Sequence, residues 1–396
     1  MRAKHLLAVA AATIAAAGAL AVASGTATAE SQQADPAALP EPSVEKVGEH
    51  VDDPTKLSYK DSDGAVTVSH PGATYVKVNF TSLDLAPGDS LTVSAPGGTE
   101  KHTYHGAPGD GLRKTDAGYT RHGDSGFAAL SVEGDTAKVT LHRSSGSTAK
   151  GAVIEGYWRG YDTKEYAKAN ADTRSVCDND ARRDVTCYAE SRPTEYANAK
   201  PVARLLMGGS ACTAFRVGNT NRLLTNNHCM SDQGTVASSE TQFGYECATC
   251  GGNDPAEPTK VGGETMVSTD AGLDYTLYSV QNFDSISSFG TLYVEEREPS
   301  AGERIYIPGH GDASPKRLSI FEEEDNGTEC SIQEPNLDST NAGYMCDTSG
   351  GNSGSPVIAG DTNKVIALHH LGGCHNAGTR MALIFPEISG DIDNNA

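Results

Sequence analysis

Residues 350–357 of this chain read GGNSGSPV, with one serine, Ser353, set among glycines and followed by a proline. Such a stretch forms tight turns, because glycine adopts backbone conformations that other residues avoid. The absence of side chains also leaves backbone N–H groups accessible to a bound group. The stretch therefore predicts either an ordinary loop or a loop that presents Ser353 for chemistry.

A serine nucleophile needs partners that other parts of the sequence must supply. It requires a base to take its proton, an acid to orient the base, and N–H donors for the oxyanion. His228 ends the segment LLTNNH, and Asp274 stands at the head of the alternating segment DYTLYSV. The sequence thus offers one candidate for each role, with N–H groups near Ser353 as the donors.

Length, charge and the first residues limit the class of protein. The chain has 396 residues and a formal net charge of -21, which argues against nucleic-acid binding. Residues 1–29 combine a basic start, an apolar run and a small-residue end, the layout of a secretory signal peptide. We therefore expect a secreted, extracellular protein that acts as a monomer and does not stay in a membrane after signal removal.

The rest of the chain divides by composition into a polar segment and two domains. Residues 30–50 are polar and proline-bearing, which predicts a linker or propeptide. Residues 51–163 alternate apolar and polar residues at 74–80, 90–95, 137–142 and 151–158, and predict a β-sandwich-like domain. Residues 164–396 hold all nine cysteines and further short strands, which favours a pair of β-barrels. A short helical turn is expected at 165–171.

The candidate residues and their surroundings resemble the chymotrypsin-fold, trypsin-like serine proteases. The order His228, Asp274, Ser353 and the G-x-S-G-x-P setting of the serine carry the resemblance, which covers roughly the last 230 residues. Within this family, the motif GNSGSP followed by VIALHHLGGC resembles the C-terminal part of secreted bacterial lysyl and glutamyl endopeptidases. The resemblance implies an all-β double barrel after the N-terminal sandwich. It also implies His228 as base, Asp274 as orienting acid, Ser353 as nucleophile, and an oxyanion hole from the N–H groups of Gly351 and Ser353.

The resemblance also bears on activation and on the cysteines. Asn352 stands where pancreatic-type zymogens carry an acid, so activation by a freed N-terminal amine is not expected. The resemblance implies a Cys212–Cys229 disulfide, and Cys330 and Cys346 flank a loop that we expect them to close. The remaining cysteines fit two schemes. One pairs Cys177 with Cys374 and Cys187 with Cys247 or Cys250; the other pairs Cys177–Cys187 and Cys247–Cys250 and leaves Cys374 free. No metal site and no cofactor is expected.

The sequence offers two alternative pockets for the side chain of the substrate residue that precedes the cleaved bond. Asp347, six residues before Ser353, occupies the place of the trypsin acid and favours Lys or Arg. The rival pocket combines Thr348 with His369 or His370, of which His370 fits the spacing best, and holds a Glu carboxylate. The expected function is a secreted serine endopeptidase acting on proteins or peptides through an acyl-enzyme, with a preference for Lys or Arg. A Glu-specific endopeptidase and a catalytically inactive protein-binding module are the alternatives.

Overall fold

The computed structural model describes residues 41–58, 64–105, 118–122, 126–144, 151–171, 174–176, 179–252, 254–322 and 327–395. The expected signal peptide, residues 1–29, lies outside these residues. No helix within the described ranges is long and apolar enough to cross a membrane.

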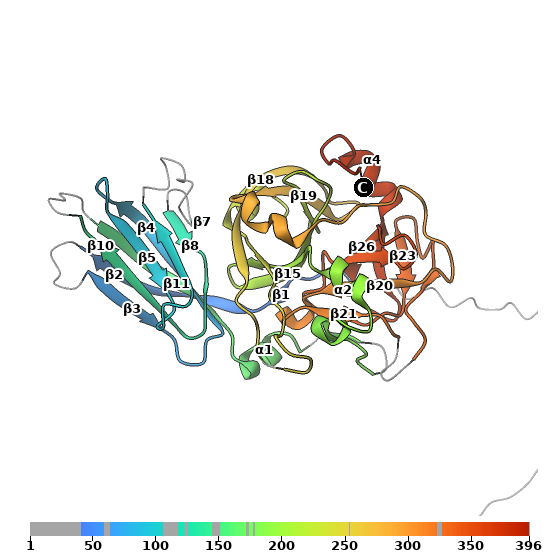
Figure 1. Cartoon of the computed structure of the whole chain (residues 1–396), viewed down its shortest axis with the longest axis horizontal. Helices are drawn as coiled ribbons and strands as arrows, with labels where there is room; N and C mark the ends of the chain where they lie inside the picture. The colour runs from blue at the N-terminus through green and yellow to red at the C-terminus, as the bar shows by residue number, and fades with distance from the viewer. Residues whose placement is uncertain are drawn as a thin grey trace, which may run out of the picture. The chain divides into compact units, whose positions relative to one another are not determined.

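The N-terminal domain contains two antiparallel sheets that share one core. The first sheet has the strand order β3-β10-β5-β6, and the second has the order β2-β11-β4-β8-β7 with β9 beside β4 (Figure 1). Apolar residues of both sheets meet in this core, where the rings of Phe80 and Phe127 stack 4.7 Å apart. The predicted sandwich strands are confirmed. Their bounds are β2 Gly48–Leu57, β3 Ala65–Ser69, β4 Tyr75–Asp84, β5 Ser90–Ser94, β6 Lys101–Tyr104, β7 Tyr119–His122, β8 Gly126–Ala129, β9 Val132–Glu133, β10 Thr136–His142 and β11 Gly151–Gly160.

The next strands close into a barrel. The order β15-β14-β17-β18-β19-β16 returns to its start because β16 also pairs with β15. Every residue of β16 and β19 is buried, as expected for strands with a core on one side and a second barrel on the other. The bounds are β14 Val202–Met207, β15 Ser210–Arg216, β16 Leu223–Thr225, β17 Glu240–Phe243, β18 Thr259–Asp270 and β19 Tyr275–Val280, with helix α3 at Gln233–Ser238.

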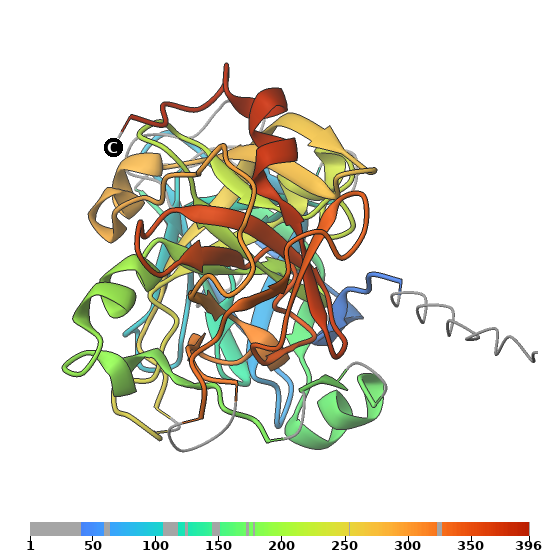
Figure 2. The ribbon, with the colours of Figure 1, turned by 90° about the vertical axis from the view of Figure 1, so that its right-hand side faces the viewer.

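The last part of the chain forms a second sheet of eight strands. Its order is β13-β21-β20-β25-β26-β27-β23-β22. Helix α4 (Met381–Ile388) follows β27 and is drawn in dark red (Figure 2). One apolar cluster contains residues of both barrels and of α4, among them Phe215, Tyr306 and Met381. The predicted all-β double barrel is therefore confirmed. The strands are β13 Arg183–Asp184, β20 Ile305–Gly309, β21 Arg317–Ser319, β22 Ile332–Glu334, β23 Asn341–Tyr344, β25 Pro356–Ala359, β26 Val365–Leu371 and β27 Asn376–Arg380.

A few short elements complete the fold. The helical turn expected at 165–171 is helix α1, Thr163–Ala169, which starts at a capping box made by Asp162 and Glu165. Helix α2 spans Pro193–Ala199, and 3-10 helices span Val185–Tyr188, Phe283–Phe289 and Gly311–Ala313. Strand β12 (Arg174–Ser175) pairs with β24 (Thr348–Ser349).

The end of the expected linker is in fact part of the fold. Strand β1 (Glu45–Lys46) pairs antiparallel with β15 of the first barrel, with Glu45 opposite Ala211. Glu45 is buried, and its carboxylate accepts a hydrogen bond from the Tyr166 hydroxyl. Polar composition predicted a linker here, but backbone pairing and a partner for the carboxylate allow this polar strand to be buried. The chain thus enters the first barrel before it forms the sandwich.

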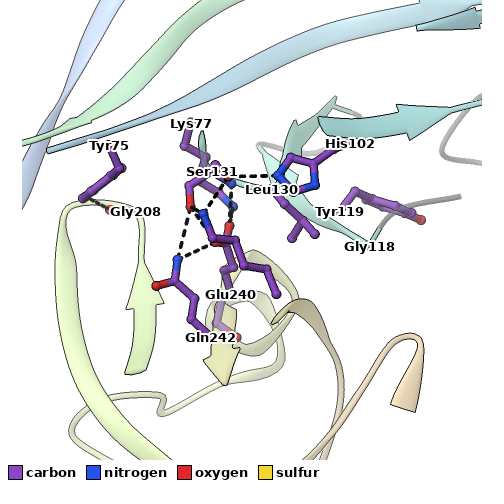
Figure 3. A network of polar contacts seen from close by, with 12 residues as sticks. Tyr75, Lys77, His102, Gly118, Tyr119, Leu130, Ser131, Gly208, Glu240 and Gln242 are labelled. Carbon is purple, nitrogen blue, oxygen red and sulfur yellow. Dashed lines mark hydrogen bonds and ion pairs between the residues drawn. The ribbon is translucent and has the colours of Figure 1, made fainter. Parts of the chain in front are cut away.

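Buried charges join the sandwich to the first barrel (Figure 3). Lys77 Nζ, from β4, lies 2.6 Å from Glu240 Oε2 of β17, and both side chains are buried. Ser131 donates its N–H to the same oxygen at 2.9 Å and its hydroxyl to Oε1 at 2.6 Å. Burial alone would raise the pKa of Glu240, but Lys77, Lys260 and the hydrogen bonds outweigh it and hold the pKa well below its usual range.

A second group of charges extends this contact. Lys260 Nζ, from β18, lies 2.7 Å from Glu100 Oε1 and 3.0 Å from Glu133 Oε1 of the sandwich. Arg204 of β14 lies 3.2 Å from Glu133. Each domain therefore buries charges whose partners belong to the other domain, and separation would leave these charges unpaired. We conclude that the sandwich is an integral part of the fold around the first barrel.

Replacing Lys77 with Met tests how much the buried charges between sandwich and barrel contribute to stability. The change removes the ion-pair partner of the buried Glu240 carboxylate, so we expect the free energy of unfolding to fall by about 3 kcal/mol. Chemical denaturation of the whole chain measures this loss. The control is Glu155→Gln, which removes the sandwich pair of Glu155 with His122, a pair whose carboxylate is 44% exposed. It should cost less than about 1 kcal/mol. Equal losses for the two variants would contradict the importance of the buried cluster.

Candidate active site

The candidate base and acid lie in direct contact. His228 Nδ1 is 2.7 Å from Asp274 Oδ2, and the His228 backbone N–H donates to Asp274 Oδ1 at 2.8 Å. Asn226 fixes the acid from the backbone side, since its Nδ2 donates to the Asp274 carbonyl at 2.8 Å. These bonds hold the imidazole with Nδ1 toward the carboxylate, which leaves Nε2 as the nitrogen free to accept a proton. Nε2 is buried and has no hydrogen-bond partner within the described residues.

Asp274 adopts an unusual backbone conformation at the start of β19. Its φ angle is +48°, in the left-handed region that non-glycine residues seldom occupy. Burial alone would raise the pKa of Asp274, but hydrogen bonds from His228 and His370 outweigh it and lower the pKa to about 2. The acid is therefore ionised at neutral pH, as an orienting carboxylate must be.

The Ser353 loop is anchored to the strand that leads to His228. The Thr213 N–H of β15 donates to the Ser353 carbonyl at 2.8 Å. Cys212, the residue before Thr213, forms a disulfide with Cys229, the residue after His228. The predicted Cys212–Cys229 bond is thus confirmed, and it ties the base to the strand beside the nucleophile. A hydrogen bond between Ser353 and His228 is not formed, a common state of catalytic contacts before substrate binds.

The backbone at the expected oxyanion hole is held in a defined conformation. Gly351 has a φ angle of +94°, and a Cβ there would lie 2.7 Å from the His310 carbonyl oxygen. The Gly351 carbonyl accepts from Thr213 Oγ1 at 2.8 Å, and the Gly350 carbonyl accepts from the Asp312 N–H at 2.7 Å. Within the described residues the N–H groups of Gly351 and Ser353 donate to no protein acceptor. Two N–H donors near one serine are what an oxyanion requires.

An arginine that the sequence did not point to lies beneath this loop. Arg182 is buried, donates to Ser349 Oγ, and pairs with Asp180 at 2.8 Å and Asp312 at 3.1 Å. An added Cβ at Gly311 would touch the side chains of Arg182 and Asn352, so these groups converge under the loop. A cation carried by the chain itself therefore supports the segment before Ser353.

The predicted pocket residues have different surroundings from those expected. Asp347 is fully buried, and its Oδ2 accepts the Ala181 N–H at 2.7 Å, so its carboxylate is turned into the protein. Thr348 Oγ1 donates to Asn376 Oδ1 at 2.9 Å. The place expected for His370 is wrong: its Nδ1 lies 2.9 Å from Asp274 Oδ2 and its Nε2 lies 2.7 Å from Asn341 Oδ1. Both ring nitrogens are engaged, so His370 has no nitrogen left for a substrate carboxylate.

Because successive side chains of β26 point to opposite faces, His369 lies on the other face of the strand from His370. His369 Nδ1 lies 2.7 Å from the Tyr344 hydroxyl, and both residues are buried. Burial, and then the charges of His370 and His228, lower the pKa of His369 to about 3. Burial raises the pKa of Tyr344 well above its usual value, so its hydroxyl keeps its proton and can donate to Nδ1. That bond would place the single imidazole proton of His369 on Nε2.

The remaining cysteines agree with the first of the two predicted schemes. Cys330 bonds to Cys346 and Cys187 bonds to Cys250, while Cys247 is a free, buried thiol. Cys374 is disulfide-bonded. The local scheme with Cys187 bound to Cys177 and with Cys374 free is therefore wrong; Cys177 itself lies outside the described residues. The sulfur atoms of Cys212 and Cys229 lie near His228, but as a disulfide they offer no thiolate to a metal.

Part of the barrel domain is similar to a known family. Residues 212–368 match the model of the trypsin-like peptidase domain. This part of the chain is therefore similar to a trypsin-like peptidase domain, and its fold is all-β.

The chain is also similar to a curated protein and to solved structures. It is 27% identical over 326 residues to Secreted RxLR effector protein 73 of Plasmopara viticola, covering 79% of this chain and 78% of that protein. A Glu endopeptidase solved in complex with MPD is 20% identical, with a TM-score of 0.42, over 56% of this chain and 100% of that one. An inactive form of the Rv3671c protease is 16% identical, with a TM-score of 0.36, over 51% and 94%.

The pKa of Asp274 predicts how its contribution to stability depends on pH. Because folding lowers this pKa from 3.8 to about 2, the ionised acid stabilises the fold above pH 4. This contribution, about 2 kcal/mol, is lost as the pH falls through 2. Asp274→Asn should therefore lower the free energy of unfolding at pH 7 and make little difference near pH 2. Denaturation curves across this range, with the exposed Asp361→Asn as control, measure it. A loss that stays constant with pH would contradict the assignment.

Proposed function

We propose that the protein is a secreted serine endopeptidase in which Ser353, His228 and Asp274 form the catalytic triad. The observation that carries the proposal is the pair of bonds from His228 to Asp274, which leaves the buried Nε2 available as a base. Ser353 attacks the carbonyl carbon of the peptide bond while Nε2 takes its proton, and the same proton then goes to the leaving amine. Water repeats these steps on the acyl-enzyme.

The oxyanion formed at each step needs donors that are already in place. The N–H groups of Gly351 and Ser353 are available within the described residues, and the bonds from Thr213 and Asp312 fix the neighbouring carbonyls. Preorganised donors of this kind stabilise developing charge without reorganisation during the reaction. In the proposed mechanism these two groups therefore bind the oxyanion.

Secretion is part of the proposal. The sequence layout of residues 1–29 supports export. The disulfides Cys187–Cys250, Cys212–Cys229 and Cys330–Cys346 suit an oxidising compartment. The substrates are accordingly extracellular proteins or peptides.

An active-site-directed phosphonate tests the nucleophile. We expect the folded protein to be labelled at Ser353 and the Ser353→Ala variant not to be labelled, because the reagent needs an activated hydroxyl. Intact-mass and peptide-mass measurements locate the label, and Ser355→Ala provides the matched control two residues away. A folded wild-type protein that neither reacts nor cleaves peptides would favour the inactive protein-binding module instead. A label that persists in Ser353→Ala would refute the residue assignment.

For the residue before the cleaved bond, we propose an acidic side chain rather than Lys or Arg. The carboxylate of Asp347 is buried and already accepts a backbone N–H, which weakens the case for a Lys or Arg pocket. His369 supplies a donor of the alternative pocket, in the role first expected of His370, whereas the Thr348 hydroxyl proton is already donated to Asn376 Oδ1. The Tyr344 hydroxyl, by bonding Nδ1, leaves Nε2–H of His369 to donate to a carboxylate.

Cleavage of a mixed peptide library tests this preference. We expect cuts after Glu, and a loss of about tenfold in kcat/KM for Glu peptides in Tyr344→Phe, because the hydroxyl no longer fixes the His369 tautomer. Tyr293→Phe removes a hydroxyl that donates to Asn219 on the surface and serves as the control. Cuts confined to Lys and Arg would overturn the acidic pocket and restore Asp347 as the specificity residue.

A further inference from the structure

Strand β1 covers one edge of β15 next to the loop that carries the candidate nucleophile. β14 pairs with the other edge of β15, and β1 pairs antiparallel with this one, with Glu45 opposite Ala211. Two residues further along β15, the Thr213 N–H is donated to the Ser353 carbonyl. β1 and the Ser353 loop are therefore neighbours along the same edge of β15.

The direction of β1 is that of the substrate segment that follows the cleaved bond. Because β1 and β15 are antiparallel, the N-terminal end of β1 points toward Thr213 and Ser353. The register, continued by one residue, sets Val44 opposite Cys212, and Val44 packs against the apolar cluster that contains Cys212 and Cys229. The segment that leaves with the substrate amine also has its N-terminal residue at the serine. β1 therefore has the place and the direction of that segment.

The proposed pocket directs the two halves of a substrate to different barrels. His369, which we assign to the residue before the cleaved bond, lies on β26 of the second barrel. The residues after that bond then extend from Ser353 toward β15 of the first barrel. An extended peptide binds to an open strand edge through its backbone, as one further strand of the sheet. At β15 the chain supplies this strand itself.

Side chains hold β1 in this place on both of its sides. The buried Glu45 carboxylate contacts Gly350 of the nucleophile loop, where an added Cβ would overlap Glu45 Oε2. The Tyr166 hydroxyl of α1 donates to the same carboxylate. On the outer edge of β1, the Lys46 N–H donates to Asn170 Oδ1 at 3.1 Å, and Asn170 Nδ2 donates to the Lys46 carbonyl at 2.7 Å. Helix α1 and its C-terminal cap therefore hold β1 against β15.

We propose that β1 is an autoinhibitory strand: it occupies the edge of β15 that binds the substrate residues after the cleaved bond, so extended substrates bind only when β1 leaves it. The inference rests on the proposed peptidase function and adds a control to it. Because β1 belongs to the same chain, its effective concentration at β15 is on the order of millimolar. A protein substrate at micromolar concentration therefore competes poorly with β1. A substrate whose leaving group is small does not reach β15 and is not affected.

Two substrates with the same acyl part separate these cases. Both carry, before the cleaved bond, the residue that the peptide library favours; one is a methyl ester and the other continues with four further residues. Glu45→Ala removes the side chain that joins β1 to the nucleophile loop. We expect this variant to lower KM for the extended peptide by about tenfold, because β1 is displaced in a larger fraction of molecules. We expect kcat for the peptide and hydrolysis of the ester to stay unchanged. Initial rates of the whole enzyme measure these constants.

Glu49→Ala is the matched control, since Glu49 lies on β2 and pairs with Arg159 of the sandwich. It should leave both substrates unchanged. An unchanged KM for the extended peptide in folded Glu45→Ala would overturn the proposal. Slower hydrolysis of both substrates would overturn it too, because Glu45 would then support the Ser353 loop and not compete with substrate. An ester that the folded wild-type enzyme does not hydrolyse would refute the peptidase function itself.

A binding measurement locates β1 without turnover. In Ser353→Ala the extended peptide stays uncut, and at a saturating concentration we expect faster amide hydrogen exchange in residues 44–47, because β1 leaves β15. A peptide that ends at the acyl residue should not change this exchange. Mass spectrometry of the exchanged protein makes the comparison. Constant exchange with the extended peptide bound would overturn the inference and leave the peptidase function standing. Faster exchange in a protein whose wild type hydrolyses neither substrate would sink the function and keep the displacement of β1.

Discussion

The ionised carboxylate of Asp274 is the group on which the candidate site depends. It accepts hydrogen bonds from the backbone and the ring of His228 and contacts the ring of His370. Its backbone occupies the left-handed region, at a cost of about 1–2 kcal/mol. The bond from Asn226 to its carbonyl and the three bonds to its carboxylate offset that cost. The left-handed conformation of Asp274 therefore places one carboxylate in contact with the imidazoles of both His228 and His370.

A similar principle operates where the sandwich meets the first barrel. Glu240 is a barrel residue, yet the cation and two of the donors that satisfy it come from Lys77 and Ser131 of the sandwich. Buried charges of this kind add little net stability compared with apolar packing, but they tolerate few alternative arrangements. They fix how the two parts meet, since a shifted contact would leave charges unpaired in a dry interface.

The sequence predicted what depends on local pattern and missed what depends on distant contacts. Alternating strands, the double barrel, and the proximity of His228 and Asp274 follow from short motifs and their order. The contact of His370 with Asp274 was not predictable, because adjacent residues of a strand face opposite sides and the register of β26 decides which histidine faces the acid. Arg182 and strand β1 were missed for a related reason. Their partners, Asp312 and Ala211, lie more than a hundred residues away along the chain.

The pairing of strand β1 with the first barrel has consequences for the maturation of the chain. Because β1 belongs to the first barrel and β2–β11 form the sandwich, the sandwich is an insertion within the barrel domain and not a separate N-terminal unit. A protease that cut the chain once between sandwich and barrel would produce a nicked protein. Its two fragments would stay together through the pairing of β1 with β15 and through the buried charges. Release of the sandwich as a leader would require the separation of β1 from β15 and of the buried ion pairs between the two domains.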